Sequence, residues 1–292
     1  MPTTASPPGS VEAAILADLA ATFRERHVDT ASGRLRLLDG GEGPPLVLLH
    51  GRGNAATSWF PLLPRLAEKR RVLAVDLPGF GASRGHRFAG RGVEAAIAFF
   101  VDPIEAWLAA EDLPAPALMG HSLGGLVALE LALRGRVTPG ALVLIGPMGT
   151  GPEMTYGSRL FFRAGPERLA RALGRAAFSR VIGAPDAPHG PRLSELTHEL
   201  HAVDGGRPDA TAAFDTLVPL VGPVPHRRPR LGTIDARTLV LWGDHDEVFP
   251  APLAIAAAAA LPRGELRIEP LGHSPHVEAV ERVLSLVEGF LG

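Results

Sequence analysis

The chain of 292 residues has a formal net charge of −2, contains no cysteine and draws 46% of its residues from the hydrophobic types. This balance excludes a disulfide scaffold, thiol chemistry and a basic nucleic-acid-binding surface, and it suits one large domain with a sizeable core. No apolar run approaches the ~18 residues of a membrane-spanning helix, and the N-terminus does not have the pattern of a signal peptide. We therefore expect a cytoplasmic enzyme without a membrane or nucleic-acid partner.

The first part of the chain predicts a helix and then two short strands. Residues 11–26 carry apolar side chains at helical spacing, and residues 27–30 and 34–38 are predicted as strands joined by a turn.

From residue 46 onwards, short apolar strands alternate with helices. The predicted strands are 46–49, 71–77, 117–119, 141–145, 238–242 and 265–269. The predicted helices are 60–68, 93–110 with an interruption at Pro103, 123–134, 251–261 and 275–291. Continuous apolar strands that alternate with helices favour an α/β fold, in which a mostly parallel sheet is covered on both faces.

The stretch between residues 146 and 237 breaks this alternation. It is rich in Arg, Pro and Gly and has helical patches at 159–171 and 193–203. It is too long for a structureless loop in a compact domain, so we predict a helical cap. The predicted organisation is an N-terminal extension with a helix (1–25), a core (26–148 and 236–292) and a helical cap (149–235).

A Gly-x-Ser-x-Gly motif at residues 120–124 lies between a predicted strand and a predicted helix. Such a sharp turn exposes the side chain of Ser122 at the carboxyl end of a sheet, where a base can reach it. A second match at 81–85 places Ser83 several residues after its strand and before a polar, Gly-rich stretch. The context therefore favours Ser122 as the nucleophile.

A serine nucleophile needs a histidine base and an acid that orients the histidine, and on this kind of turn the acid precedes the histidine in the chain. Asp244 and Asp246 both follow the strand at 238–242. Asp244 lies beside Gly243 and suits a turn, whereas Asp246 is better placed to reach across the site. Asp246 is therefore the favoured acid.

Two histidines follow the last predicted strand, His273 and His276. Ser274 suits the N-cap of the final helix and Pro275 its first residue. His273 then lies in the loop before the helix and His276 within its first turn. Because a loop residue reaches the nucleophile more freely, we favour His273 as the base.

Five motifs in this order together resemble the α/β-hydrolase superfamily, in the serine branch with a helical cap after the sixth strand. They are His50-Gly51, residues 76–83, residues 120–125, Gly243 with Asp246, and Gly272-His273. The resemblance implies an eight-stranded sheet whose second strand is antiparallel, and no metal or organic cofactor. It also implies a catalytic triad of Ser122, Asp246 and His273.

An oxyanion hole needs two backbone N–H donors. One donor is the residue after the nucleophile, Leu123, and the other comes from the loop at residues 50–54. The resemblance assigns this second donor to Arg52, and it makes Asp76 and Ser83 chiefly structural. The Arg52 side chain is expected either to meet a substrate carboxylate or to point to solvent. We further expect substrate contacts at three residues: Gly51, Gly53 and His121.

Serine rather than aspartate at the nucleophile position argues against epoxide opening and dehalogenation. We expect carboxylesterase-like cleavage of a small-molecule ester, thioester or lactone through an acyl-enzyme on Ser122. One alternative is a C–C bond hydrolase of aromatic degradation, because the loop at 50–59 has a similar length in those enzymes. They differ in usually carrying Gly-Pro-Gly-Ala at 53–56 and Trp at the position of Ser274. The other alternative is a non-catalytic, ligand-binding member of the fold.

Overall fold

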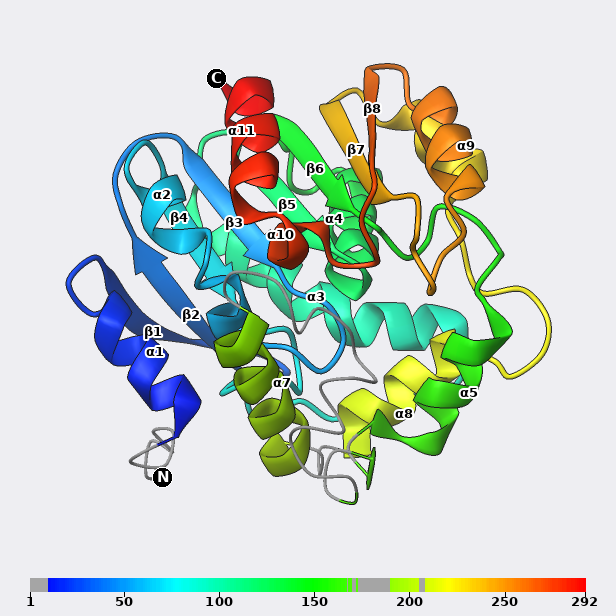
Figure 1. Ribbon diagram of the computed structural model, residues 1–292, viewed down its shortest axis with the longest axis horizontal. Helices are drawn as coiled ribbons and strands as arrows, with labels where there is room; N and C mark the ends of the chain where they lie inside the picture. Colours follow the sequence, from blue (N-terminus) through cyan, green and yellow to red (C-terminus); the bar gives the residue numbers. More distant parts are fainter. Residues whose placement is uncertain (1–9, 167, 170–171, 173–189, 205–207) are drawn as a thin grey trace.

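A computed structural model describes residues 10–166, 168–169, 172, 190–204 and 208–292 of the chain (Figure 1). Its centre is an eight-stranded sheet with the order β1-β2-β4-β3-β5-β6-β7-β8. The strands are β1 (Phe23–Thr30), β2 (Gly33–Gly40), β3 (Pro45–Leu49), β4 (Arg71–Val75), β5 (Ala117–His121), β6 (Ala141–Ile145), β7 (Arg237–Gly243) and β8 (Gly264–Glu269). β2 is antiparallel to both of its neighbours, and the other adjacent pairs are parallel. The predicted fold class and the antiparallel second strand are confirmed.

The N-terminal helix is shorter than predicted. α1 covers Val11–Leu19, and the chain is already in strand β1 from Phe23. The helix prediction is wrong for residues 23–26 because these residues pair with β2 along its whole length, from Phe23 opposite Gly40 onwards. Arg26 also donates to Asp39 across this hairpin at 2.8 Å. Cross-strand pairing therefore outweighs the local helical spacing.

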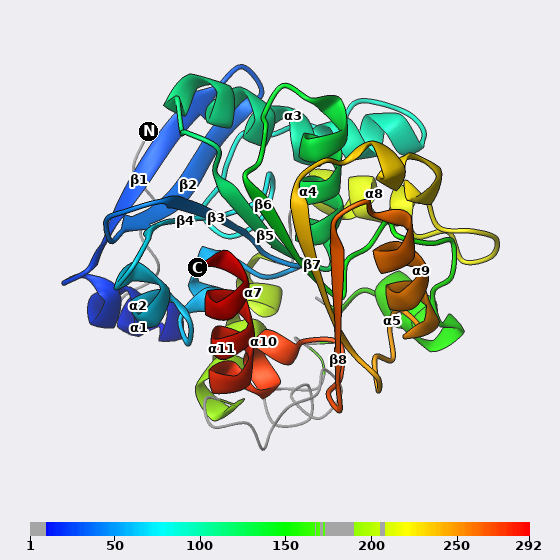
Figure 2. The same ribbon diagram turned by 90° about the horizontal axis from the view of Figure 1, so that it is seen from above.

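Helices cover both faces of the sheet (Figure 2). One face carries α3 (Val93–Glu111), α4 (Leu123–Arg134) and α9 (Pro252–Ala260), and the other carries α1, α2 (Leu63–Ala67) and α11 (Val280–Leu291). Strand β3 shows the division: Val47 and Leu49 belong to the apolar cluster on the first face, Leu46 and Leu48 to the cluster on the second. Alternate side chains of a strand point to opposite faces, so one apolar run supplies both layers.

Three helices differ in detail from the predictions. Residues 60–62 of the segment predicted at 60–68 are not α-helical, and a 3₁₀ turn, η1 (Ala56–Trp59), precedes α2. The predicted interruption at Pro103 is wrong, because α3 continues through it. Proline removes one helical hydrogen bond, but its neighbours Phe100 and Ile104 are buried, and their packing holds the helix together. The final helix is divided into α10 (Pro275–Glu278) and α11.

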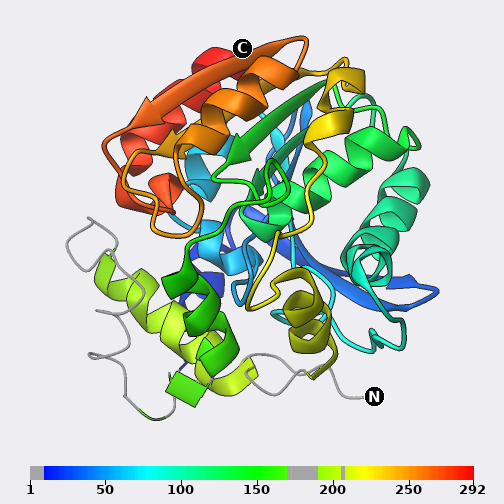
Figure 3. The ribbon, with the colours of Figure 1, turned by 90° about the vertical axis from the view of Figure 1, so that its right-hand side faces the viewer.

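The segment between β6 and β7 contributes α5 (Tyr156–Ala164), α7 (Gly190–Asp204), α8 (Pro208–Leu217) and the 3₁₀ turn η2 (Arg228–Thr233). α5 and α7 include much of the two predicted helical patches, although residues 167 and 170–171 of the first patch lie outside the described residues. Figure 3 shows α5 and α7 at the end of the sheet toward which the parallel strands point. The division into extension (1–25), core and cap (149–235) stays a prediction.

Candidate active site

Ser122 lies at the turn between β5 and α4 in a backbone conformation that serine rarely adopts, with φ 52° and ψ −114°. The neighbouring strand holds it there. The Ser122 N–H donates to the carbonyl of Ile145 at the end of β6 (3.1 Å), and the Ser122 carbonyl accepts from Met148 N–H (2.9 Å). Such a strained residue persists only where its surroundings fix it, and it presents the hydroxyl at the carboxyl end of the sheet.

Ser83, from the competing motif, is fully buried. Its Oγ donates to the Asp76 carbonyl at 2.7 Å and accepts from Arg36 N–H at 3.0 Å. Both roles of the hydroxyl are therefore used within the protein, which favours Ser122 over Ser83 as the reactive serine.

The favoured acid and base are in direct contact. His273 Nδ1 lies 2.8 Å from Asp246 Oδ2, and the Asp246 side chain is completely buried. The other oxygen, Oδ1, accepts from Val248 N–H (2.7 Å) and Phe249 N–H (2.9 Å). Asp244, by contrast, is exposed and lies beside His245. Since the carboxylate can only accept, Nδ1 of His273 carries the proton and Nε2 is left as the basic nitrogen of the neutral ring.

Gly146 shows that this pair lies beside the serine turn. A Cβ at Gly146 would stand 3.3 Å from both Asp246 Oδ2 and His273 Nδ1. The preceding residue, Ile145, accepts the Ser122 N–H. The loops after β5, β7 and β8 therefore gather the three predicted triad residues around the end of β6.

The loop after β3 lies directly against the serine turn. A Cβ at Gly51 would stand 2.8 Å from His121 Nδ1 and 3.4 Å from Ser122 Cβ, so the loop approaches closely only because Gly51 has no side chain. The next residue is Arg52, and Leu123 opens α4. The first N–H groups of a helix have no acceptor within it, so the Leu123 N–H is available to a ligand. The oxyanion-hole role of these two N–H groups stays a prediction.

His50 fixes this loop with both ring nitrogens, a role that the sequence did not reveal. Its Nε2 accepts from Leu77 N–H at 2.9 Å, so Nδ1 carries the proton and donates to the Gly51 carbonyl at 2.7 Å. Burial lowers the pKa of His50 to about 4, which keeps the ring neutral. His50 thus joins the loop after β3 to the loop after β4.

The Arg52 side chain does not point to solvent, so that alternative is wrong. Only 8% of the residue is exposed. Its guanidinium carbon lies 5.6 Å from the ring centre of Phe162 in α5 and 5.4 Å from that of Phe214 in α8. Helices from the segment between β6 and β7 therefore cover the loop after β3, which lies against the serine turn.

Two further imidazoles, those of His121 and His276, pack behind the candidate base with their rings tilted. The ring of His121 lies 4.9 Å from that of His273 and 4.4 Å from that of His276, which packs on Trp59 at 4.6 Å. His121 Nε2–H donates to the His273 carbonyl at 3.1 Å. Burial, with the neighbouring His273, lowers the pKa of His276 to about 3 and that of His121 well below its usual value. Both rings are neutral, and the substrate contact predicted for His121 stays a prediction.

Within the part of the chain that the structure describes, no group of three or more His, Asp or Glu side chains is placed to hold a metal ion. Across the same residues, no helix combines the length and the apolar character needed to cross a bilayer.

The sheet order, the serine turn and the acid–histidine pair beside it are the arrangement of an α/β hydrolase. A sequence profile of the alpha/beta hydrolase family matches residues 46–286. The chain belongs to this family.

The chain is similar to hydrolases of several kinds. The chain is 30% identical over 281 residues to a 2-hydroxymuconate semialdehyde hydrolase from Pseudomonas sp. (strain CF600), which covers 91% of this chain and 93% of the relative. The crystal structure of esterase RhEst1 from Rhodococcus sp. ECU1013 matches with a TM-score of 0.72 and 27% identity over 92% of this chain and 98% of that one. A membrane phospholipase A structure matches with a TM-score of 0.77 and 26% identity over 96% and 91%. These matches support hydrolase activity in general.

Proposed function

We propose that the protein is a serine hydrolase that cleaves a carboxylic ester, thioester or lactone of a small molecule through an acyl-enzyme on Ser122. The contact between His273 Nδ1 and Asp246 Oδ2, 2.8 Å long and beside the Ser122 turn, carries this proposal. It supplies a base of fixed tautomer next to a nucleophile that the backbone holds at the end of the sheet.

In the acylation step, Ser122 Oγ attacks the carbonyl carbon while His273 Nε2 takes the hydroxyl proton. The tetrahedral oxyanion is stabilised by the backbone N–H groups of Arg52 and Leu123. The resulting imidazolium then gives its proton to the leaving alcohol or thiol. A water molecule attacks the acyl-enzyme with His273 again as base, which releases the acid and restores the serine.

Asp246 contributes by orientation and charge. Two backbone N–H groups, those of Val248 and Phe249, fix one of its oxygens, so the other is aimed at His273. An oriented carboxylate keeps the histidine in the productive tautomer and stabilises the imidazolium when it forms.

The test uses p-nitrophenyl acetate as substrate and a fluorophosphonate as an active-site trap. We expect ester turnover that is lost in proportion to labelling, with mass spectrometry placing the label on Ser122. Full labelling at another residue, or turnover that survives complete labelling of Ser122, would overturn the proposal. The absence of both turnover and labelling would favour the non-catalytic, ligand-binding alternative.

A second candidate is C–C bond hydrolysis, because the chain is 30% identical to a 2-hydroxymuconate semialdehyde hydrolase over 91% of its length. The same serine, acid and histidine would cleave the C–C bond of a dienone acid. If a dienone acid has a larger kcat/KM than every ester in a series of graded acyl length, C–C bond hydrolysis replaces the ester proposal.

The cytoplasmic location stays a prediction from the sequence.

A further inference from the structure

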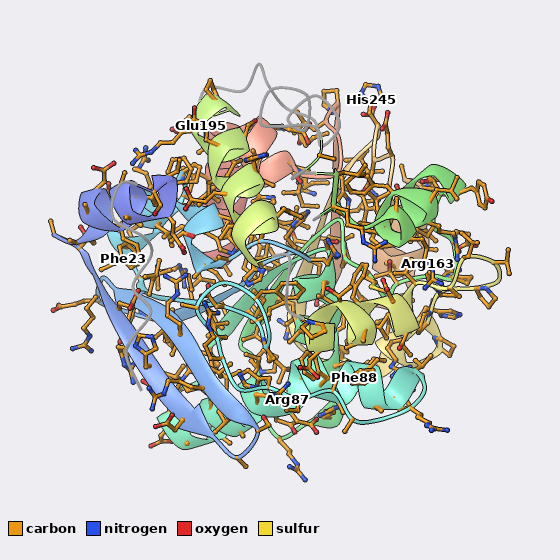
Figure 4. The ribbon with its side chains drawn as sticks, turned by 90° about the horizontal axis from the view of Figure 1, so that it is seen from below. Phe23, Arg87, Phe88, Arg163, Glu195 and His245 are labelled. Atoms are coloured by element: carbon orange, nitrogen blue, oxygen red, sulfur yellow. The ribbon has the colours of Figure 1, made fainter. Side chains whose placement is uncertain are left out.

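Helix α1 lies beside α7, the helix that Glu195 marks in Figure 4 (Figures 1 and 4). The carboxylate of Glu199 in α7 accepts from Val11 N–H at 2.7 Å and from Glu12 N–H at 3.2 Å. These are the first two residues of α1, whose N–H groups have no acceptor within the helix. A carboxylate is also favoured at this end by the helix dipole. Glu199 therefore completes the N-terminus of a helix that lies 188 positions away in sequence.

A second polar contact fixes the direction of the two helices. Arg192 Nη2 lies 2.6 Å from Asp18 Oδ2. Arg192 precedes Glu199 by about two helical turns, and Asp18 follows Val11 by the same distance, so α1 and α7 are antiparallel. Apolar residues of both helices share one buried cluster: Ile15, Leu19, Leu193, Leu196 and Leu200. The pair is thus a packed antiparallel unit with a polar contact at each end.

The C-terminal part of α7, which carries Glu199, also carries His201 and reaches the candidate active site. A Cβ at Gly53 would stand 2.8 Å from His201 Cε1, so the imidazole lies on the loop next to Arg52. Gly53 has φ +76°, which a larger residue rarely adopts. His201 Nδ1–H donates to the Thr197 carbonyl at 2.8 Å, so the ring is fixed to α7 itself. A shift of α7 would therefore move the imidazole relative to the loop.

α1 is in turn anchored to the sheet. The carboxylate of Glu12 accepts from Arg36 Nη2 at 2.7 Å and from Thr57 Oγ1 at 3.1 Å. Arg36 belongs to β2 and is 1% exposed, and Thr57 belongs to η1 and is fully buried. Buried charge-assisted hydrogen bonds of this kind hold α1 in one place on the core.

Building on the proposed function, we propose that Glu199 is a positioning residue for substrate binding. By binding the N-terminus of the anchored helix α1, Glu199 holds α7 in place and keeps His201 against the loop at Gly53. Release of α7 lowers the fraction of molecules with a complete binding site. The apparent affinity for substrate falls in proportion to the fraction of molecules that keep a complete binding site. The chemistry at Ser122 is unchanged.

The decisive comparison is Glu199→Ala against Ser10→Ala. Ser10 is the N-cap of α1, and its side chain accepts from Ala13 N–H at 3.1 Å. Both substitutions remove an acceptor from the first turn of α1, but only the first breaks a bond to α7. In hydrogen exchange, we expect α7 amides of Glu199→Ala to exchange at least about fivefold faster than in wild type, whereas Ser10→Ala affects only the first turn of α1. Unchanged α7 exchange in folded Glu199→Ala would overturn the proposal.

Kinetics with p-nitrophenyl acetate separate positioning from general destabilisation. Glu199→Ala should raise KM about threefold to tenfold while kcat stays within about twofold, and Ser10→Ala should change neither. Glu199→Gln keeps one acceptor oxygen without the charge, so it should give an intermediate KM and serves if the alanine variant does not fold. A fall in kcat at constant KM would contradict the proposal.

A double-substitution cycle with His201→Ala tests the route of the effect. If Glu199 acts through His201, adding Glu199→Ala to His201→Ala should raise KM by less than about twofold. Independent, multiplicative effects would overturn this route. If the wild-type protein hydrolyses no ester, the proposed function fails, and the exchange comparison still decides whether Glu199 holds α7.

Discussion

His273 and Asp246 meet at 2.8 Å although 27 positions separate them in the chain. The register of the sheet brings them together, because Gly243 at the end of β7 pairs with Glu269 at the end of β8. Two short loops then start side by side and turn toward the end of β6. The pair is therefore positioned by strand register, and any variant that keeps the sheet should keep the geometry of the pair.

Ser122→Ala should lower kcat for ester hydrolysis by about 10⁴–10⁶, because only binding and the oxyanion hole then remain. Ser83→Ala should retain most of the activity and lower the free energy of unfolding by about 1–3 kcal/mol, since Arg36 N–H and the Asp76 carbonyl lose their buried partner. Steady-state kinetics and urea denaturation check the two variants. An inactive but folded Ser83→Ala would refute the choice of nucleophile.

Asp246→Asn should reduce kcat by about 10⁴, because an amide can donate to His273 Nδ1 and would then stabilise the wrong tautomer. Asp244→Asn should stay within about twofold of wild type, since its exposed side chain lies beside His245 and His273 is held by Asp246. Kinetics with circular dichroism as a folding control measure both. A larger loss in Asp244→Asn than in Asp246→Asn would mean that the acid is misassigned.

His121→Phe should lower kcat about tenfold or more with little change in KM. The phenyl ring keeps the packing on His276 but lacks the N–H that holds the His273 carbonyl, and leaving this partly buried carbonyl without its donor costs up to about 1–3 kcal/mol. His121→Gln supplies an amide N–H of similar reach and should recover most of kcat. Equal activity of the two variants would show that the hydrogen bond to His273 does not position the base.

Stability should fall as the pH is lowered from about 6.5 toward 4. Burial lowers the pKa of His50 to about 4 and that of His276 to about 3, and it lowers the pKa of His121 in the same direction. In the unfolded chain these rings titrate near about 6.5, so within this window the unfolded state binds more protons and is favoured by acid. Above about 6.5 both states are neutral at these residues, and this part of the stability is complete.

His276→Phe provides the matching measurement. Removing one such histidine should reduce the slope of unfolding free energy against pH by up to about 1.4 kcal/mol per pH unit between about pH 4 and 6.5. Urea denaturation across this pH range gives both slopes, and identical slopes for His276→Phe and wild type would rule out this account.

Local sequence patterns predicted much of the candidate site. The strand–turn–helix context distinguishes Ser122 from Ser83. In the structure Ser122 lies at a strained turn, whereas Ser83 is buried and its hydroxyl is hydrogen-bonded. The choice of Asp246 and His273 used positions just after strands, and the parallel sheet brings such positions together. These features follow from neighbours in the sequence and one rule of topology.

Contacts between segments that are distant in the sequence could not be predicted in this way. Residues 23–26 continue the helical spacing of α1, and only pairing with β2 makes them a strand. The placement of Arg52 beside the rings of Phe162 and Phe214 depends on how α5 and α8 fold back over the loop after β3. The hydrogen bonds of His50 and the position of His201 on Gly53 likewise join segments that have no common pattern in the sequence.

The bond between Glu199 and Val11 sets an order of events during synthesis. The first turn of α1 leaves the ribosome before α7 does, and its acceptor follows 188 residues later. At about 5–20 residues per second, translation of that stretch takes roughly 10–40 s. During this time the apolar face that α1 later shares with α7 lacks its partner helix. Helix α1 is thus completed only after α7 has been made, and until then shielding of its apolar face would protect the nascent chain.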